Sequence, residues 1–188
     1  MKPIYAAYDW QARPAGDRYI FCPLCTTRLV IEEICGRSRK VCPQCGFIHF
    51  LNPAPAIGLL IVKDGKVLLG ERLNQPGVGK WALPSGYIDF EEDYLSAAKR
   101  EALEETGLQL NLRSIVLVES AFLSPEWHYL TVYLFAEPEA GTLQAGDDLK
   151  SVGWFPVTGP LPEMAFEPDV NLILDYASGR LPELAFHP

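Results

Sequence analysis

Residues 86–108 read GYIDFEEDYLSAAKREALEETGL, and this stretch predicts a short loop followed by one helix. Its second half consists almost wholly of Ala, Leu, Lys, Arg and Glu, which favour helix. Asp89 is the expected N-cap, and Glu92 three residues later completes a capping box. Gly107 stands where a helix C-cap glycine belongs. The pattern therefore predicts a helix that ends just before residue 107.

Three carboxylates lie near the end of this expected helix. Glu101, Glu104 and Glu105 are spaced i, i+3 and i+4, so their side chains share one side of the helix. A solvated acidic face is the commoner state of such residues. The alternative is a divalent-cation site, because hard cations take carboxylate oxygens as ligands. The helix pattern alone leaves both interpretations open.

The spacing of the whole stretch favours the cation site. Gly86, five residues, Glu92, seven residues and then REALEETGL closely resemble the Nudix box, the signature of hydrolases that act on nucleoside diphosphates linked to another moiety. Ala102 fills an aliphatic position and is a small departure. The resemblance covers about residues 54–160. It implies an α/β/α sandwich with a mixed β-sheet, and the order of expected strands and helices predicts the same α+β arrangement.

The resemblance implies a metal-binding role for four residues. Glu101 and Glu105 would be the principal ligands, and Glu104 would be a further ligand or would orient a metal-bound water. The carbonyl of Ser85 would complete the coordination. Mg²⁺ or Mn²⁺ is the expected ion, since both bridge phosphate oxygens while keeping several waters.

The same resemblance implies a structural role for the other box residues. Glu92 and Arg100 would form an ion pair that ties the loop to the helix. Gly86 and Gly107 would be required for backbone conformation.

Residues beyond the box are expected to complete the active site. The family's catalytic base is often a carboxylate on a distant loop, and the candidates are Asp147, Asp148, Glu119 and Glu126. Of these we favour the loop that contains Asp147 and Asp148. Three aromatic residues are candidates for stacking on a base or flavin ring, although aromatics in strands more often belong to the core: Phe122, Trp127 and Tyr129.

Composition and charge limit the classes of function. The chain has 188 residues, 48% hydrophobic and 21% charged, which is typical of a globular protein. Its net charge of −8 argues against broad nucleic-acid binding. No apolar run approaches the length of about 20 residues that spans a bilayer, and residues 1–18 lack the apolar core of a signal peptide. We therefore expect a cytoplasmic protein without a membrane partner.

Four of the five cysteines form two CxxC pairs. Cys22 and Cys25 precede Cys42 and Cys45 at the separation typical of a four-thiolate zinc ribbon. A pair of redox motifs is the alternative, but neither pair stands between a strand and a helix. Cys35 has no partner at metal spacing and is expected in a hairpin turn.

These features predict four segments. Residues 1–20 would be an N-terminal arm, 21–50 a zinc ribbon, 54–160 the Nudix hydrolase domain, and 161–188 a C-terminal helix and tail. Within the domain, 56–62 is a continuous apolar run and predicts a buried strand. Asp64-Gly65 predicts a hairpin, and residues 170–178 predict the terminal helix.

A zinc ribbon before a Nudix domain resembles the NADH pyrophosphatases. Those proteins carry an SQPWPFPxS-like motif after the box, whereas residues 119–127 read ESAFLSPEW. The architecture resembles more closely the ribbon-bearing proteins that cleave FAD or ADP-ribose. We therefore expect Mg²⁺- or Mn²⁺-dependent hydrolysis of the pyrophosphate in such a small nucleotide, with NADH as the alternative. A nucleic-acid-linked role, a non-catalytic nucleotide-binding role and a homodimer stay open.

Overall fold

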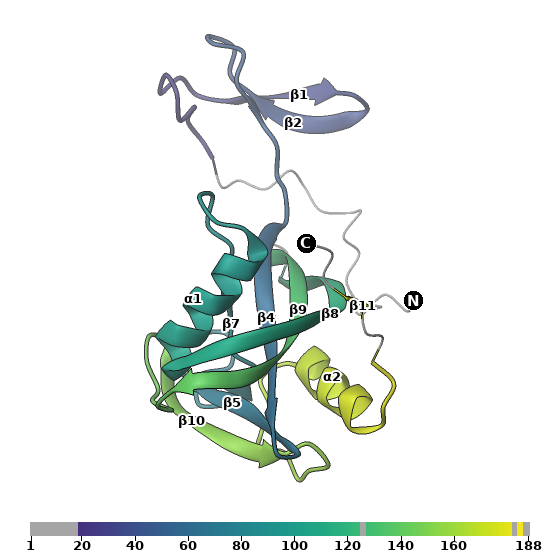
Figure 1. The fold of residues 1–188 in the computed structure, drawn as a ribbon. Coiled ribbons are helices and arrows are strands. Elements are labelled where there is room, and N and C mark those ends of the chain that lie inside the picture. The colour runs from purple at the N-terminus through teal and green to yellow at the C-terminus, as the bar shows by residue number, and fades with distance from the viewer. Residues whose placement is uncertain (1–18, 125–126, 182–183, 186–188) are drawn as a thin grey trace. The chain divides into compact units, whose positions relative to one another are not determined.

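The computed structural model describes residues 19–124, 127–181 and 184–185 (Figure 1). Backbone contacts divide the chain into two compact units, and each is considered by itself. One contains Met1–Ala54 with Ala121–Tyr129, and the other contains Pro55–Ser120 with Leu130–Pro188. The expected arm at residues 1–20 lies almost wholly outside the described residues.

The first unit contains a small three-stranded sheet. Its strands β1 (Val30–Ile34), β2 (Arg37–Val41) and β3 (Ile48–His49) are antiparallel and lie in the order β1-β2-β3. Cys35 and Gly36 form the turn between β1 and β2 with φ of 52° and 72°. This is the hairpin turn predicted for Cys35.

A sheet of eight strands builds the second unit. Its order is β10-β5-β4-β9-β8-β11, with β6 paired to β5 and β7 paired to β4. The strands are β4 (Ala54–Lys63), β5 (Lys66–Arg72), β6 (Trp81–Ala82), β7 (Ser85–Tyr87), β8 (Leu108–Ser124), β9 (Trp127–Gly141), β10 (Leu149–Pro156) and β11 (Leu184–Ala185).

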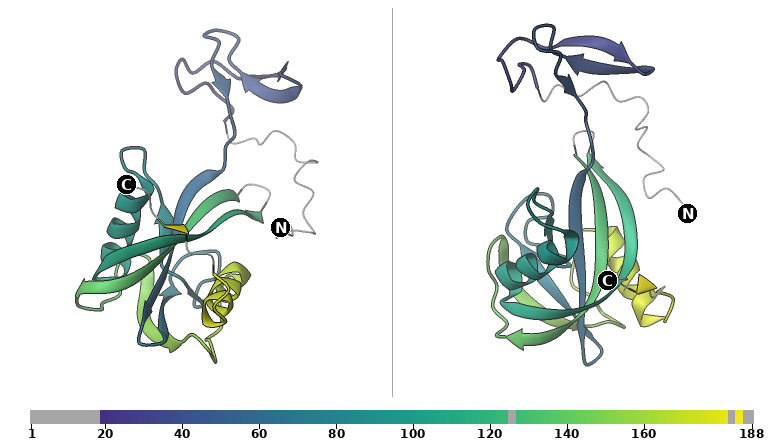
Figure 2. Two further views of the ribbon diagram at one scale, coloured as in Figure 1. Left: turned by 45° about the vertical axis from the view of Figure 1, so that its right-hand side comes forward. Right: turned by 45° about the horizontal axis from the view of Figure 1, so that its top comes forward.

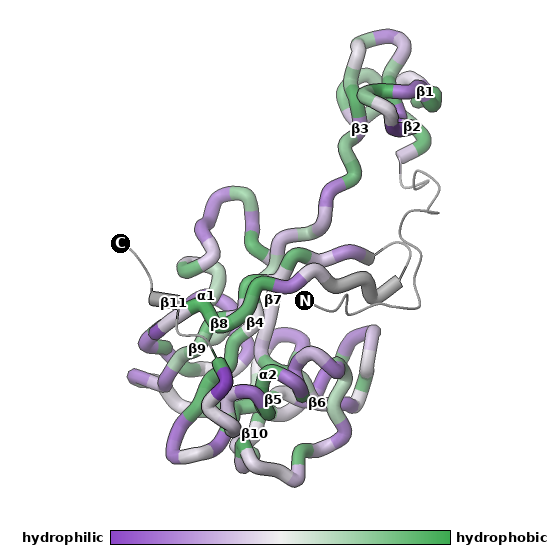
Figure 3. The backbone as a smooth tube through the Cα atoms, turned by 90° about the vertical axis from the view of Figure 1, so that its right-hand side faces the viewer, coloured by the Kyte–Doolittle hydropathy of each residue, from purple (hydrophilic) through white to green (hydrophobic). Residues whose placement is uncertain are grey.

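Helices cover both faces of this sheet, α1 (Tyr94–Thr106) on one and α2 (Glu167–Ala177) on the other (Figures 1 and 2). Strand β4 is buried on both faces. Its Leu59 belongs to the apolar cluster beneath α1, whereas Leu60 belongs to the cluster that contains Ile173 of α2. The double burial explains the continuous apolar run of β4, which Figure 3 shows in green.

The turn between β4 and β5 has the predicted chemistry. Asp64 and Gly65 have φ of 50° and 70°, and Val62 pairs with Val67 across the hairpin. Two consecutive residues at positive φ form the type of two-residue turn that Asp-Gly favours.

Helix α1 begins four residues later than the capping box predicted. Its N-cap is Asp93, whose Oδ1 accepts hydrogen bonds from the backbone N–H groups of Leu95 and Ser96. The expectation for Asp89 was therefore wrong. Glu92 does accept the Asp89 N–H, but it does so within the loop. Gly107 is the C-cap with φ of 71°, as predicted.

Helix α2 begins three residues before the predicted 170–178 and ends at Ala177. Pro168 lies in its first turn, where the missing N–H group costs no helical hydrogen bond. The apolar pattern used for the prediction does not extend over this polar first turn.

Candidate metal and active site

Glu105 is the most deeply buried carboxylate of the box, with 3% of its surface exposed. Its Oε2 accepts a hydrogen bond of 2.9 Å from the backbone N–H of Ser85 on β7. Burial raises the pKa of Glu105 to about 9, and the neighbouring Asp148 carboxylate adds to the effect. The side chain thus lies between β7 and the loop before β10.

Glu101 lies one turn earlier on the same face of α1 and is 7% exposed. Its carboxylate packs against Gly86, where a Cβ atom would lie only 1.9 Å from Oε1. Any side chain at residue 86 would therefore displace this carboxylate. Burial raises the pKa of Glu101, while hydrogen bonding and charge attraction from Arg100 oppose the rise.

Arg100 connects the box loop to the helix. It forms an ion pair with Glu92 and donates 3.0 Å hydrogen bonds to Glu92 Oε2 and to the backbone oxygen of Tyr87. Its Nη1 also contacts Glu101 Oε1 at 2.8 Å and Glu104 Oε2 at 3.1 Å. The hydrogen bonds from Arg100 lower the pKa of Glu92. Glu104 is the most exposed of the three helix acids that were expected to bind metal.

The loop that contains Asp147 and Asp148 lies against the C-terminal end of α1. The N–H of Gly146 donates to the backbone oxygen of Glu105 at 3.1 Å. The carboxylate of Asp148 helps to raise the pKa of Glu105, and the charge of Asp147 helps to raise the pKa of Glu101. The buried Oδ1 of Asp148 has no hydrogen-bond partner among the described residues. Of the predicted base candidates that the structure describes, these two are the ones brought to the box.

The other predicted positions are either apart from the box or outside the described residues. Glu119 lies near Asp169, whose charge helps raise the pKa of Glu119. Glu126, together with the side chains of Phe122 and Trp127, lies outside the described part of the chain. Tyr129 belongs to the first unit. Stacking by the three aromatic residues therefore stays a prediction.

The donor set fits a hard divalent cation. Glu101, Glu105 and Asp148 lie close enough for their charges to act on one another and all offer carboxylate oxygen, and burial disfavours these negative charges unless a cation compensates them. The carboxylates are neighbours and do not form a closed cage. Among the described side chains, only the four ribbon cysteines bring three or more ligand atoms within 4.8 Å of one another.

The ribbon cysteines have the geometry of a thiolate metal site. The Sγ atoms of Cys25 and Cys42 are 3.4 Å apart, and those of Cys22 and Cys45 are 3.6 Å apart. A disulfide would need about 2.05 Å, whereas tetrahedral thiolates at about 2.3 Å from zinc lie roughly 3.8 Å apart. Cys35 is exposed and lies outside this cluster.

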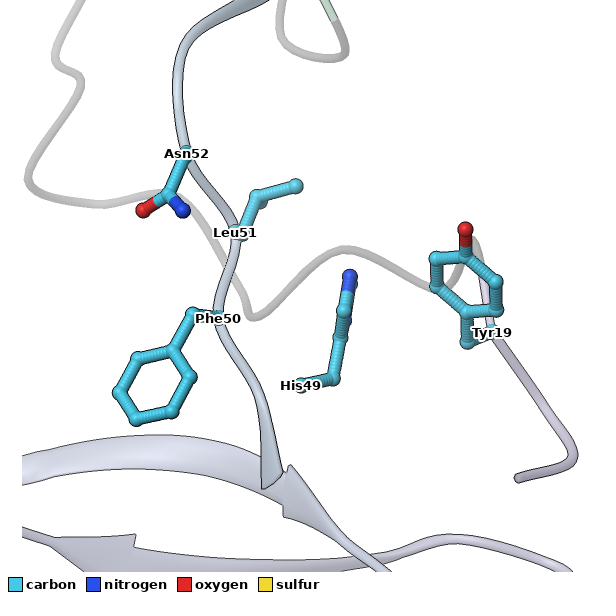
Figure 4. Close-up of a pocket in the computed structure, with 5 residues that line it drawn as sticks. All are labelled: Tyr19, His49, Phe50, Leu51 and Asn52. Carbon is cyan, nitrogen blue, oxygen red and sulfur yellow. The ribbon is translucent and has the colours of Figure 1, made fainter. Parts of the chain in front are cut away.

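The first unit also has a hollow of about 510 Å³ lined by Tyr19, His49, Phe50, Leu51 and Asn52 (Figure 4). The rings of Tyr19 and His49 pack edge-to-face, with centroids 4.5 Å apart and planes inclined by 68°. Burial lowers the pKa of His49. The described lining has no carboxylate, the side chain that most often binds Mg²⁺ or Mn²⁺.

Sequence reasoning missed Asp169 on α2. This residue is 3% exposed, and its Oδ2 accepts a 3.0 Å hydrogen bond from the N–H of Leu83. Its Oδ1 accepts a 3.3 Å bond from the hydroxyl of Tyr133, and burial raises its pKa to about 6. The partners are separated by 86 and 36 residues. No local spacing in the sequence indicates such contacts.

Comparison with known proteins identifies the family. The profile described as NUDIX domain matches residues 52–176. The chain belongs to the Nudix family. It is 37% identical over 128 residues to an ADP-ribose pyrophosphatase of Methanocaldococcus jannaschii, a match that covers 68% of this chain and 75% of that protein.

A second relative is the NAD-capped RNA hydrolase NudC of Chromobacterium violaceum, 28% identical over 157 residues. That match covers 81% of this Nudix chain and 56% of the relative, so the chain spans little more than half of that protein. Among solved structures, a NUDIX hydrolase of Nitrosomonas europaea is 25% identical with a TM-score of 0.74, covering 90% of this chain and 97% of that one.

These matches confirm the predicted α+β fold with a mixed β-sheet, and the structure itself shows the four-cysteine cluster near the N-terminus. They also confirm that the protein is a Nudix pyrophosphohydrolase. None of its helices in the described segments is long and apolar enough to cross a membrane.

Proposed function

We propose that the protein hydrolyses the pyrophosphate bond of ADP-ribose or a related small dinucleotide such as FAD, with Mg²⁺ or Mn²⁺ held by the box carboxylates. The observation that carries this proposal is Glu105, a buried carboxylate fixed by Ser85 and next to Asp148. Burying several acids together is costly unless a cation offsets their charge.

Each residue then has a distinct part in the reaction. Glu101, Glu104 and Glu105, with the carbonyl of Ser85, would hold the ions. Bound Mg²⁺ or Mn²⁺ supplies charge neutralisation to the two phosphates and activates water. Hydrolysis adds one water across the P–O–P bridge, so ADP-ribose would give AMP and ribose 5-phosphate.

The loop before β10 supplies the proposed base. Asp148 offers an unpartnered buried oxygen beside Glu105, and Asp147 adds negative charge near Glu101. An ionised carboxylate there can take a proton from the attacking water. We assign this part to Asp148, with Asp147 as the alternative.

The four ribbon cysteines would hold a structural Zn²⁺ rather than a catalytic one. Four thiolates fill the tetrahedral coordination and leave no open position for water. A segment as small as the predicted ribbon cannot build its own apolar core, so the metal would supply its folding free energy.

The name of the Methanocaldococcus relative supports ADP-ribose as the substrate. A second candidate is an NAD-type substrate, supported by the NudC relative and by the ribbon before the box. Residues 119–127 lack the motif that accompanies NADH specificity, which favours ADP-ribose or FAD.

A substrate panel tests the proposal. The protein is incubated with ADP-ribose, FAD, NADH or NAD-capped RNA, each with Mg²⁺ or Mn²⁺ and with EDTA as the control, and products are separated by chromatography. We expect ADP-ribose or FAD to have the highest kcat/KM. Preferential cleavage of NADH or capped RNA would contradict the substrate assignment, and equal rates in EDTA would contradict the metal requirement.

A further inference from the structure

The segment Leu83-Pro84-Ser85 is fixed at three consecutive residues. The N–H of Leu83 donates to Asp169 at 3.0 Å, and the N–H of Ser85 donates to Glu105 at 2.9 Å. Between them, the backbone oxygen of Pro84 accepts a 2.8 Å bond from the N–H of Leu59 on β4. The segment thus joins α2, the central strand and α1 within three residues.

The chain just before α2 also pairs with the start of this segment. The N–H of Trp81 donates to the backbone oxygen of Glu163 at 2.9 Å, and the N–H of Ala165 donates back to Trp81 at 2.7 Å. Residues 163–169 therefore run beside residues 81–83, and Asp169 provides the last of these contacts, at Leu83.

Asp169 is a costly residue to keep at this position. It is buried, and its charge acts on Glu119 of β8, whose two oxygens are buried without a hydrogen-bond partner among the described residues. Tyr133 of β9 donates to Asp169, and Arg72 of β5 stabilises its charge. Apolar residues at both acid positions would pack at less cost, so the carboxylate at 169 calls for a role other than core packing.

We infer that Asp169 is a positioning residue for the metal site, acting through Leu83 to hold the backbone at Ser85 where that carbonyl and Glu105 together meet the cation. This inference rests on the proposed function, which makes Ser85 and Glu105 metal ligands. Removal of a group that orients a metal ligand without itself binding the metal typically weakens metal affinity by about 10- to 100-fold. The C-terminal helix is then part of the metal site's support.

A purely structural role makes a different prediction. If Asp169 only satisfies the Leu83 N–H and packs α2, its removal would lower stability and leave the metal affinity of the remaining folded protein unchanged. The affinity for Mn²⁺ alone separates the two roles.

The test compares Asp169→Leu with Asp169→Asn. Leucine removes the acceptor of the Leu83 N–H at similar size, whereas the asparagine oxygen can still accept that bond. Ile173→Val is the matched control, because it loosens the packing of α2 and leaves the acceptor of the Leu83 N–H in place. Mn²⁺ binding to the zinc-loaded full chain is followed by electron paramagnetic resonance of free Mn²⁺, and the site is defined as the one lost in Glu105→Gln.

We expect Asp169→Leu to weaken this site about tenfold, and both Asp169→Asn and Ile173→Val to stay within about twofold of the unsubstituted protein. At Mn²⁺ concentrations that only part-fill the weakened site, Asp169→Leu should hydrolyse ADP-ribose more slowly than the unsubstituted protein, and saturating Mn²⁺ should restore most of the rate. Unchanged Mn²⁺ affinity in Asp169→Leu would overturn the inference. Absence of a Glu105-dependent site in the unsubstituted protein would instead overturn the proposed function.

Amide hydrogen exchange provides a second measurement if Asp169→Leu does not fold. In the unsubstituted protein, saturating Mg²⁺ should slow exchange at Leu83 and in the first turn of α2 as well as at Ser85. Slowing at Ser85 alone would overturn the inference, because the coupling through Leu83 would then be missing.

Discussion

Glu119 shows, at the scale of one residue, how burial sets protonation. Its carboxyl is 4% exposed, and burial together with the charge of Asp169 raises its pKa to about 7. A carboxyl whose pKa is raised on folding stabilises the folded state fully below its unfolded pKa, and this stabilisation is lost as pH rises through the folded value. Glu119 should therefore destabilise the protein progressively between about pH 4.5 and pH 7.

Glu119→Gln removes this pH-dependent cost. At pH 5 the variant should match the unsubstituted protein, because the folded state already carries the neutral acid. At pH 8 it should be more stable by on the order of 2 kcal/mol. Urea unfolding at both pH values, with the exposed Glu139→Gln as control, measures the difference. An equal effect of Glu119→Gln at pH 5 and pH 8 would refute the assigned pKa.

The sequence predicted the residues whose partners are close along the chain. Glu101, Glu105, Arg100 and Glu92 stand within one spaced pattern, and the structure brings them together around α1. Glu119 and Asp169 are separated by fifty residues along the chain. They come near each other only because α2 packs against the face of the sheet that includes β8. No periodicity or spacing carries that information, so this acid pair could not be predicted.

Among the elements, α1 shows how tertiary contacts decide between two capping signals. Asp89 and Asp93 are both good N-cap residues. The hydrogen bonds of Arg100 with Glu92 and with the Tyr87 backbone hold residues 87–92 as a loop, so the helix begins after Asp93. In contrast, Gly107 needed no tertiary information, because a positive φ at a helix end favours glycine wherever the helix packs.

Substitution of the two candidate caps tests this assignment. Asp93→Ala should cost about 1 kcal/mol of unfolding free energy, because two helix N–H groups lose their acceptor. Asp89→Ala should cost less than about 0.5 kcal/mol, since no hydrogen bond of its side chain fixes the helix. Chemical denaturation of both variants provides the values, and a larger loss in Asp89→Ala would contradict the cap at Asp93.

For the whole molecule, zinc should be a stoichiometric part of the protein. The four ribbon cysteines converge without a disulfide, and we expect one zinc per chain to survive gel filtration. Cys42→Ser should lose the zinc, whereas Cys35→Ser should retain it because Cys35 lies outside the cluster. Elemental analysis of the three proteins decides the point. Zinc-free protein purified without chelators, or zinc loss in Cys35→Ser, would count against the four-cysteine site.

The central claim is that α1 and the loops before it and before β10 form a divalent-cation site for pyrophosphate hydrolysis. Its most direct test is the rate of ADP-ribose hydrolysis at saturating Mn²⁺ for Glu105→Gln, with Glu139→Gln as an exposed control on the same unit. Glutamine keeps the size of the side chain and removes a ligand charge. We predict that Glu105→Gln loses at least about a hundredfold in kcat while Glu139→Gln keeps its full rate. A Glu105→Gln variant that hydrolyses ADP-ribose at the unsubstituted rate would contradict the account.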